Sequence, residues 1–293
     1  MWHIRIVAPS LLINIFVFLF GLIIGSFLNV CIVRIPERKS IVTPPSACPR
    51  CDTPIRPYDN IPLASWLLLR GRCRACKTRI PAMYPIVELL TALMFWGCYR
   101  LFGMTAEGVK WATFSSLMII LVFTDLNLRI LPDKVNYTGL ALGLAFTQVT
   151  MPADGLSILL VSEIFGRLPS ERTLSLTDAI LGALVGGGLL WLVSELYFWM
   201  RRREGMGLGD VKMMLMAGAF LGVRRTILTI LAGSLLGSIL GMAFILVRRK
   251  NASTYELPFG SFLGTAALLV VFFGIPFMNW YHSVGIFRII EHW

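Results

Sequence analysis

The stretch PSLLINIFVFLFGLIIGSFLNVCI, residues 9–32, contains no Lys, Arg, Asp or Glu. A helix needs roughly 20 predominantly apolar residues to cross the hydrocarbon core of a bilayer. The stretch is also longer than the ~7–15-residue apolar core of a cleavable signal peptide. It therefore predicts a retained membrane-spanning helix near the start of the chain.

The composition extends this prediction to the rest of the chain. The 293 residues are 56% hydrophobic and 15% charged, with a mean hydropathy of +0.74, whereas a soluble domain is about 45–50% apolar and 25% charged. These values exclude an ordinary water-soluble enzyme, and they exclude an intrinsically disordered chain, which is poor in apolar residues. Seven further apolar runs follow, at 83–102, 109–128, 134–151, 179–200, 211–223, 226–247 and 259–280. The predicted fold class is an all-α polytopic membrane protein with about eight transmembrane helices.

The distribution of basic residues predicts the topology. The net charge of +11 arises from 27 Lys and Arg against 16 Asp and Glu, and basic residues stay preferentially in cytoplasmic loops. With eight alternating spans, nineteen of the 27 fall on one face, ten of them within residues 33–82. We therefore expect residues 33–82 in the cytoplasm, both termini outside, and a basic surface that faces anionic lipid rather than nucleic acid. The polar stretch 152–177, which holds the short apolar run 158–164, is expected to be an external loop.

Four of the six cysteines form two CxxC pairs, Cys48/Cys51 and Cys73/Cys76, with 21 residues between the pairs. Each pair can present two thiolates to one metal ion, and four sulfur ligands complete the tetrahedral shell that zinc prefers. Two disulfides are the alternative, but disulfides rarely persist in the cytoplasm. Since four thiolates leave no open coordination position, we expect structural zinc in a small cytoplasmic segment inserted after the first helix.

Two aspartates at the predicted cytoplasmic face are the candidate catalytic residues. Asp125 lies near the end of the third apolar run, and Asp210 opens the sixth, directly after GMGLG at 205–209. Ionisable residues within spans are functional candidates because their burial in lipid is costly. Two carboxylates that meet in a low-dielectric site share a proton, which supplies a general base for water and a general acid for a leaving amide. This is the chemistry of an aspartyl protease.

The spacing of these acids is also compatible with purely structural roles. Asp125 can pair with Arg129 one helical turn later, and Asp210 can cap the following helix. Asp133 and Glu204 are further acids on the same face, and Asp133 directly precedes the fourth run, as an N-cap or loop anchor would.

A set of motifs runs through nearly the whole chain: GSFLNVC at 25–31, RIP at 34–36, the two CxxC pairs, YDNIP at 58–62, SWL at 65–67, RGRC at 70–73, YPIVE at 84–88, Asp125, LPD at 131–133, and GMGLGDVK at 205–212. Together they resemble the type IV prepilin leader peptidases, which are bifunctional membrane enzymes. The resemblance implies that Asp125 and Asp210 are the catalytic pair of a membrane aspartyl endopeptidase of the GxGD type.

The resemblance also implies the substrates and the second activity. The substrates would be type IV prepilins or type II secretion pseudopilins, cut after a Gly that ends a short basic leader, in the bacterial inner membrane at its cytoplasmic face. The new N-terminal residue would then be methylated from S-adenosylmethionine. We thus expect a first transmembrane helix at 1–33, a methyltransferase-associated zinc segment at 34–82, and a peptidase domain at 83–293. The residues that bind the methyl donor stay unassigned.

Two alternatives are distinguishable by experiment. An intramembrane protease of presenilin-like type would cut deep inside its substrate's span rather than at the edge. An ion- or proton-coupled transporter would use Asp125 and Asp210 as a relay, although the fourth, fifth and seventh runs carry few polar residues, with Glu195 as the main exception.

Overall fold

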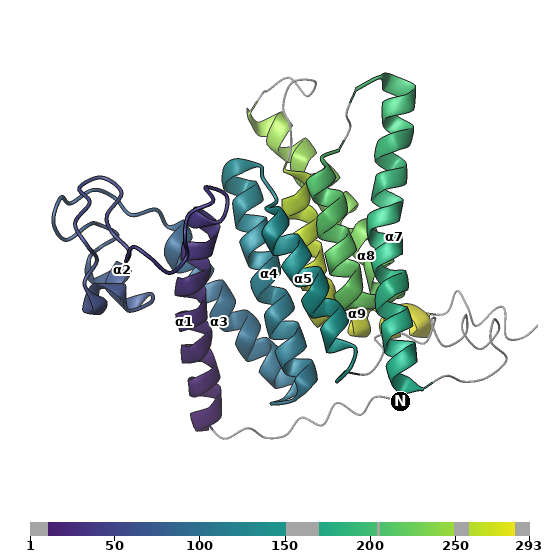
Figure 1. Ribbon diagram of the computed structural model, residues 1–293, viewed down its shortest axis with the longest axis horizontal. Coiled ribbons are helices and arrows are strands. Elements are labelled where there is room, and N and C mark those ends of the chain that lie inside the picture. Colours follow the sequence, from purple (N-terminus) through teal and green to yellow (C-terminus); the bar gives the residue numbers. More distant parts are fainter. Residues whose placement is uncertain (1–10, 151–169, 204–205, 249–257, 285–293) are drawn as a thin grey trace, which may run out of the picture. The chain divides into compact units, whose positions relative to one another are not determined.

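The fold was described from a computed structural model, which covers residues 11–150, 170–203, 206–248 and 258–284. Throughout these residues the regular structure is helical, with two isolated β-bridges and no strand. The elements in chain order are α1 (Leu11–Arg34), the 3₁₀ helix η1 (Pro57–Asn60), α2 (Ala64–Leu68), α3 (Met83–Phe102), α4 (Ala106–Leu128), α5 (Asp133–Phe146), α7 (Glu171–Arg201), α8 (Leu208–Arg248) and α9 (Phe259–Val284), as Figure 1 shows.

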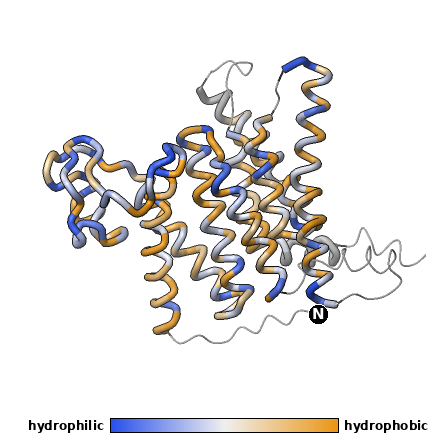
Figure 2. Tube along the Cα trace, in the orientation of Figure 1, coloured by the Kyte–Doolittle hydropathy of each residue, from blue (hydrophilic) through white to orange (hydrophobic). Residues whose placement is uncertain are grey.

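Five helices in the described part of the chain are long and apolar enough to cross a membrane. They are α1, α3, α4, α7 and the part of α8 from Leu208 to Ala243, and Phe259–Gly274 is a shorter apolar segment of α9. Figure 2 shows hydrophobic residues along these helices and hydrophilic residues through much of the segment between α1 and α3. The protein therefore has the helical fold of a multi-pass membrane protein. The predicted number of eight spans stays a prediction, since α5 has only 14 residues.

The start of α7 differs from the position expected from the sequence. The predicted end of the external loop 152–177 is wrong, because α7 already begins at Glu171. The hydroxyl of Ser170 accepts a hydrogen bond from the Thr173 amide at 3.3 Å and caps the helix, which satisfies one of the free amides of the first turn. The run 158–164 and Glu204 lie outside the described residues.

The sixth and seventh apolar runs fall on the two halves of α8, which is interrupted at Gly222. Its backbone has φ 74° and ψ 177°, a conformation far from helical and essentially confined to glycine. Asp178 of α7 is 1% exposed, and its Oδ1 accepts a hydrogen bond from the Val223 amide at 3.4 Å. A buried carboxylate therefore caps the second half of α8.

The chain divides into two compact units, Met1–Val135 and Asn136–Trp293. In the first unit, α1 packs closely on α3. A Cβ atom at Gly21 would lie 2.6 Å from the Ala92 Cα, and one at Gly25 would lie 2.6 Å from the Glu88 Cα. Such Gly-xxx-Gly spacing lets two helix backbones approach within a membrane. It brings the backbone of Glu88 directly against α1.

The second unit uses the same device between α7 and α8. Gly182 and Gly186 face α8, and a Cβ atom at either would collide with the backbone of Gly218 or Met214. Small residues at four-residue spacing thus hold the two long helices together. The first half of α8, which begins with Asp210 in its first turn, is anchored by this contact.

Candidate functional site

The four cysteines of the CxxC pairs converge in space. Their sulfur atoms all lie within 4.8 Å of one another, and the Cys48 and Cys76 Sγ atoms are 3.8 Å apart. All are free thiols. Zinc–sulfur bonds of about 2.3 Å in a tetrahedron place the sulfur atoms about 3.8 Å apart, far beyond the ~2.05 Å of a disulfide. The cluster could therefore hold one metal ion, and its donor set fits zinc.

Both cysteine pairs are presented by the same local backbone. The amide of the first cysteine in each pair donates to the carbonyl five residues later, at 3.0 Å from Cys48 and 2.9 Å from Cys73. The residue after each second cysteine has a left-handed backbone, with φ 51° at Asp52 and 59° at Lys77. Each pair thus forms a tight turn that directs two sulfur atoms to one side.

Local hydrogen bonds favour the thiolate form of two cysteines in this cluster, Cys51 and Cys73, whereas desolvation and hydrogen bonds with the other cysteines raise the pKa of Cys76 to about 11. The side chain and backbone of Thr53 hydrogen-bond to the Cys51 sulfur, which lowers the pKa of that thiol to about 6. The backbone amides of Cys76 and Ala75 lower the pKa of Cys73 in the same way. Because the thiolate is the form that binds metal, these contacts prepare Cys51 and Cys73 for a cation.

An ion pair fixes the loop between the two turns. The Arg74 guanidinium donates to both carboxylate oxygens of Asp59, from Nε to Oδ2 at 2.9 Å and from Nη2 to Oδ1 at 2.6 Å. This bidentate geometry is the strong form of a carboxylate–arginine contact. The Arg74 hydrogen bonds hold the pKa of Asp59 below its usual value. The segment is thus tied to the turn that carries Cys73.

Asp125 lies three residues before the end of α4 and is buried, with 6% of its surface exposed. Arg129 ends the helix with a left-handed backbone, φ 55°, and its amide donates to the Asp125 carbonyl at 2.8 Å. A left-handed residue after the last turn is a common helix stop. The carboxylate is therefore placed near one end of α4, as the sequence predicts.

Asp210 occupies the first turn of α8 and is half-buried. Its amide donates to the Gly207 carbonyl at 3.1 Å. Two residues later, the Lys212 ammonium lies 5.6 Å from the centre of the Tyr137 ring. Asp133 is exposed in the first turn of α5, a position where a carboxylate favours the helix dipole.

Asp125 belongs to the first compact unit and Asp210 to the second. The structure thus brings together the four cysteines, whereas the pairing of the two aspartates stays a prediction. Each aspartate lies within one turn of a helix end. This is the position that chemistry at a membrane edge would require.

Comparison with known proteins identifies the family. The chain is 35% identical over 297 aligned residues to a protein of Aeromonas salmonicida strain A449, which covers 91% of this chain and 93% of that protein. The family model described as the type IV leader peptidase family matches residues 112–242. The chain belongs to the type IV leader peptidase family. The model of the bacterial peptidase A24 N-terminal domain matches residues 19–102.

Other members of the family match over similar lengths. A protein of Myxococcus xanthus strain DK1622 is 40% identical over 246 residues, which covers 84% of this chain and 67% of that protein. A protein of Pseudomonas aeruginosa is 35% identical over 279 residues, which covers 87% of this chain and 89% of that protein. All three relatives are named prepilin leader peptidase/N-methyltransferase. No solved structure matches the chain significantly.

The two family models divide the candidate residues between them. The N-terminal model covers the cysteine cluster, and the peptidase model covers Asp125 and Asp210. The sequence motifs include one further acid of the N-terminal region to which no role was assigned, Glu88 of the YPIVE motif, and it is buried in the second turn of α3. Its signal was available, since a carboxylate within an apolar run is a functional candidate.

Proposed function

We propose that this protein is a membrane aspartyl endopeptidase that also methylates its product. It cleaves the basic leader from type IV prepilins or type II secretion pseudopilins after a Gly at the membrane edge. It then N-methylates the new N-terminal residue. The observation that carries the proposal is the similarity, over 91% of the chain, to a relative named for these two activities. None of the matched relatives described above has a transporter name, so the transporter alternative has no support.

For the peptidase step, the proposed catalytic residues are Asp125 and Asp210. One carboxylate, ionised, takes a proton from the attacking water while the other, protonated, donates its proton to the departing amide nitrogen. Because two interacting carboxylates titrate as a pair, neither role is assigned to one residue. The burial of Asp125 supports the shared-proton arrangement, since a low dielectric disfavours two charges side by side.

The proposed setting is the bacterial inner membrane, with the active site at its cytoplasmic face. The five candidate spans and the excess of basic residues in 33–82 support this orientation. The apolar helix of the substrate would lie in the bilayer, and its basic leader would stay in the cytoplasm. The scissile bond would then reach the helix ends that carry the two aspartates.

The cysteine cluster is proposed to hold structural zinc through Cys48, Cys51, Cys73 and Cys76. The 3.8 Å sulfur–sulfur contact supports a tetrahedral site, which has no position left for substrate. The residues that hold zinc would also fix the two turns against each other. In this way the cluster stabilises residues 34–82, which we propose serve the methyl-transfer step. S-adenosylmethionine, when bound, supplies the methyl group.

The test is mass spectrometry of a prepilin co-expressed with the enzyme in membranes, because one spectrum reports both the cut and the added methyl group. The wild-type enzyme should yield a product that lacks its leader and carries one N-terminal methyl group. Asp125→Asn and Asp210→Asn should each reduce cleavage by at least about 1000-fold, since a neutral amide can neither take up nor release the proton. Glu195→Gln, at an exposed position of α7, is the matched control and should cleave normally.

Three results would contradict the proposal. Full cleavage by either aspartate variant excludes the aspartyl mechanism. A cut deep inside the substrate's apolar helix favours a presenilin-like protease instead. If prepilin is cut but no sample contains methylated product, the methyl-transfer activity is excluded and the peptidase activity stands.

A further inference from the structure

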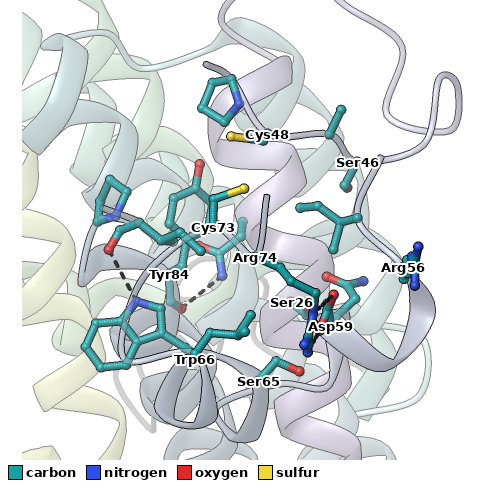
Figure 3. A pocket seen from close by; sticks show the side chains of 18 of the residues that line it. Ser26, Ser46, Cys48, Arg56, Asp59, Ser65, Trp66, Cys73, Arg74 and Tyr84 are labelled. Carbon is teal, nitrogen blue, oxygen red and sulfur yellow. Dashed lines mark hydrogen bonds and ion pairs between the residues drawn. The ribbon is translucent and has the colours of Figure 1, made fainter. Parts of the chain in front are cut away.

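A cavity of about 520 Å³ lies beside the cysteine cluster, within the first compact unit. Small-molecule sites are commonly about 300–1,000 Å³, mostly apolar, with a few polar groups placed among the apolar walls. The last turns of α1, the segment 46–81 and the first turns of α3 form its walls. Figure 3 shows Trp66 and Tyr84 on one side of the cavity and Asp59 and Arg56 on the other.

Glu88 is the unusual member of the cavity wall. It is only 8% exposed, and its Oε2 accepts a hydrogen bond from the Leu63 amide at 2.8 Å. The side chain of Ser26 is within hydrogen-bonding reach of the same carboxylate. Among the residues that the structure describes, no basic nitrogen lies within 4.0 Å of it. A buried carboxylate with neutral partners only is costly unless a cation joins it.

The other carboxylate in the wall is already neutralised. Asp59 forms its bidentate ion pair with Arg74. Arg34, which also lines the cavity, donates to the carbonyls of Ser40 at 3.0 Å and Pro44 at 2.8 Å. Glu88 is thus the acid of this cavity that retains its capacity for a positively charged ligand.

A second polar residue in the wall, Asn29, has a side-chain oxygen without a hydrogen-bond partner. Asn29 is 4% exposed. Its amide nitrogen donates to the Tyr84 carbonyl at 3.0 Å, but its Oδ1 is buried and accepts no hydrogen bond. Buried polar atoms are nearly always hydrogen-bonded, so an orphan acceptor in a cavity wall marks a place where a ligand can donate.

The aromatic part of the wall is held rigid. The Trp66 indole donates to the Ile80 carbonyl at 3.3 Å. A Cβ atom at Gly71 would lie 2.8 Å from the Trp66 ring, so the absence of a side chain there leaves room for the indole. A fixed aromatic surface suits a planar heterocycle, and its face attracts a cation.

We propose that this cavity binds the methyl donor S-adenosylmethionine, with Glu88 as the counter-ion of its cationic end and Asn29 Oδ1 as an acceptor for one of its N–H groups. This inference rests on the proposed methyl-transfer function and names the residues that serve it. S-adenosylmethionine fits because it combines a sulfonium, an ammonium and an adenine ring. Those groups match an unpaired carboxylate, an orphan acceptor and an aromatic wall.

The experiment measures equilibrium binding of labelled S-adenosylmethionine to the full-length protein in lipid nanodiscs, without prepilin. Glu88→Gln keeps the shape and the acceptor for Leu63 but removes the charge, and it should weaken binding by about 10- to 100-fold. Glu37→Gln is the matched control, because Glu37 is exposed and paired with Lys39 at 2.6 Å, outside the cavity. It should bind as the wild type does.

A second variant covers the case in which Glu88→Gln fails to fold, as judged by thermal unfolding without ligand. Val33 lines the cavity and is 39% exposed, so the larger side chain of Val33→Trp can extend into the cavity and narrow it. This variant should bind S-adenosylmethionine more weakly than the wild type. S-adenosylhomocysteine, which lacks the sulfonium charge, shows which cationic group Glu88 contacts. If Glu88→Gln weakens binding of S-adenosylmethionine but not of S-adenosylhomocysteine, Glu88 lies at the sulfonium. If the variant weakens binding of both ligands equally, Glu88 lies at the ammonium.

The proposal is overturned if folded Glu88→Gln binds S-adenosylmethionine within twofold of the wild type, or if Val33→Trp binds it normally. It is also overturned if the wild-type protein methylates prepilin but binding is lost only on substitutions outside the cavity. These results differ from a failure of the proposed methyl-transfer function itself, in which co-expressed prepilin carries no methyl group in the wild-type sample, whether or not it is cut.

Discussion

Gly222→Ala adds a single methyl group, but we expect it to lower the free energy of unfolding of the α7–α8 unit substantially. At this position the backbone has φ 74° and ψ 177°, which an L-residue rarely adopts. A Cβ atom would also collide with the Asp178 carboxylate, whose Cγ would be only 2.9 Å away. The substitution therefore strains the backbone and displaces the side chain that caps the second half of α8.

The size of the effect follows from these two contributions. A non-glycine residue in this region of φ and ψ costs about 1–3 kcal/mol. Displacing Asp178 breaks its hydrogen bond with the Val223 amide, and a buried amide without a partner costs about 1–3 kcal/mol. Since the two contributions are not strictly additive, we expect the free energy of unfolding to fall by about 2–5 kcal/mol.

The assay is reversible unfolding in mixed micelles, titrated with SDS and followed by helical circular dichroism. Gly188→Ala is the matched control, because a Cβ atom there meets nothing within 4 Å, and it should change stability by less than about 0.5 kcal/mol. Adding Asp178→Ala to Gly222→Ala removes the collision. The double variant should therefore be more stable than the sum of the single effects implies, by at least about 1 kcal/mol.

Two results would refute this reasoning. If Gly222→Ala unfolds within about 0.5 kcal/mol of the Gly188→Ala control, the helix is not interrupted as described. If the two substitutions at Asp178 and Gly222 prove additive, the carboxylate does not limit the space at Gly222.

The remaining predictions concern the first compact unit. Cys48→Ser should reduce bound zinc from about one ion per chain to almost none, whereas Cys31→Ser, at a buried thiol of α1, should leave the zinc content unchanged in elemental analysis. Hydrogen bonds lower the pKa of the metal-free Cys51 thiol from 9.0 to about 6, so the stabilisation that its thiolate gives the metal-free segment is complete above pH 9 and is lost as the pH falls through 6. Thermal unfolding of the zinc-stripped protein should show this loss of stability, and a stability that is constant from pH 9 to pH 5 would contradict it. Gly25→Ala would put a Cβ atom 2.6 Å from the Glu88 Cα, so it should force α1 and α3 apart, destabilise the unit by about 1–3 kcal/mol in the same SDS titration, and weaken binding of S-adenosylmethionine.

Local patterns in the sequence predicted much of this protein. The apolar runs 9–32, 83–102 and 109–128 match α1, α3 and α4 within a few residues, because hydrophobicity over about 20 residues reflects a single helix crossing a bilayer. The spacing of the cysteines predicted their convergence, which the cluster confirms. The start of α7 was wrong by eight residues, since its first turns are polar and depend on the cap at Ser170.

The cavity and its acid illustrate what such patterns cannot supply. Glu88 is one charged residue in an apolar run, and the same would be true if it faced lipid, a neighbouring helix or a ligand. Only the approach of α1 through Gly25 and the position of the Leu63 amide make it a buried carboxylate in a cavity wall. Asp178 is similar, because its capping role depends on a backbone break 44 residues away in α8.

The sequence by itself determined the membrane class of the protein, the zinc-type cysteine spacing and the two candidate aspartates, because hydropathy, ligand spacing and charge in apolar runs are properties of short stretches. The tertiary structure alone decided which helix backbones touch, which buried carboxylates have partners, and where a ligand-sized space remains. Those outcomes depend on which residues of separate helices face each other, because two helix backbones approach closely where at least one of the facing residues is a glycine, as Gly25 is opposite Glu88.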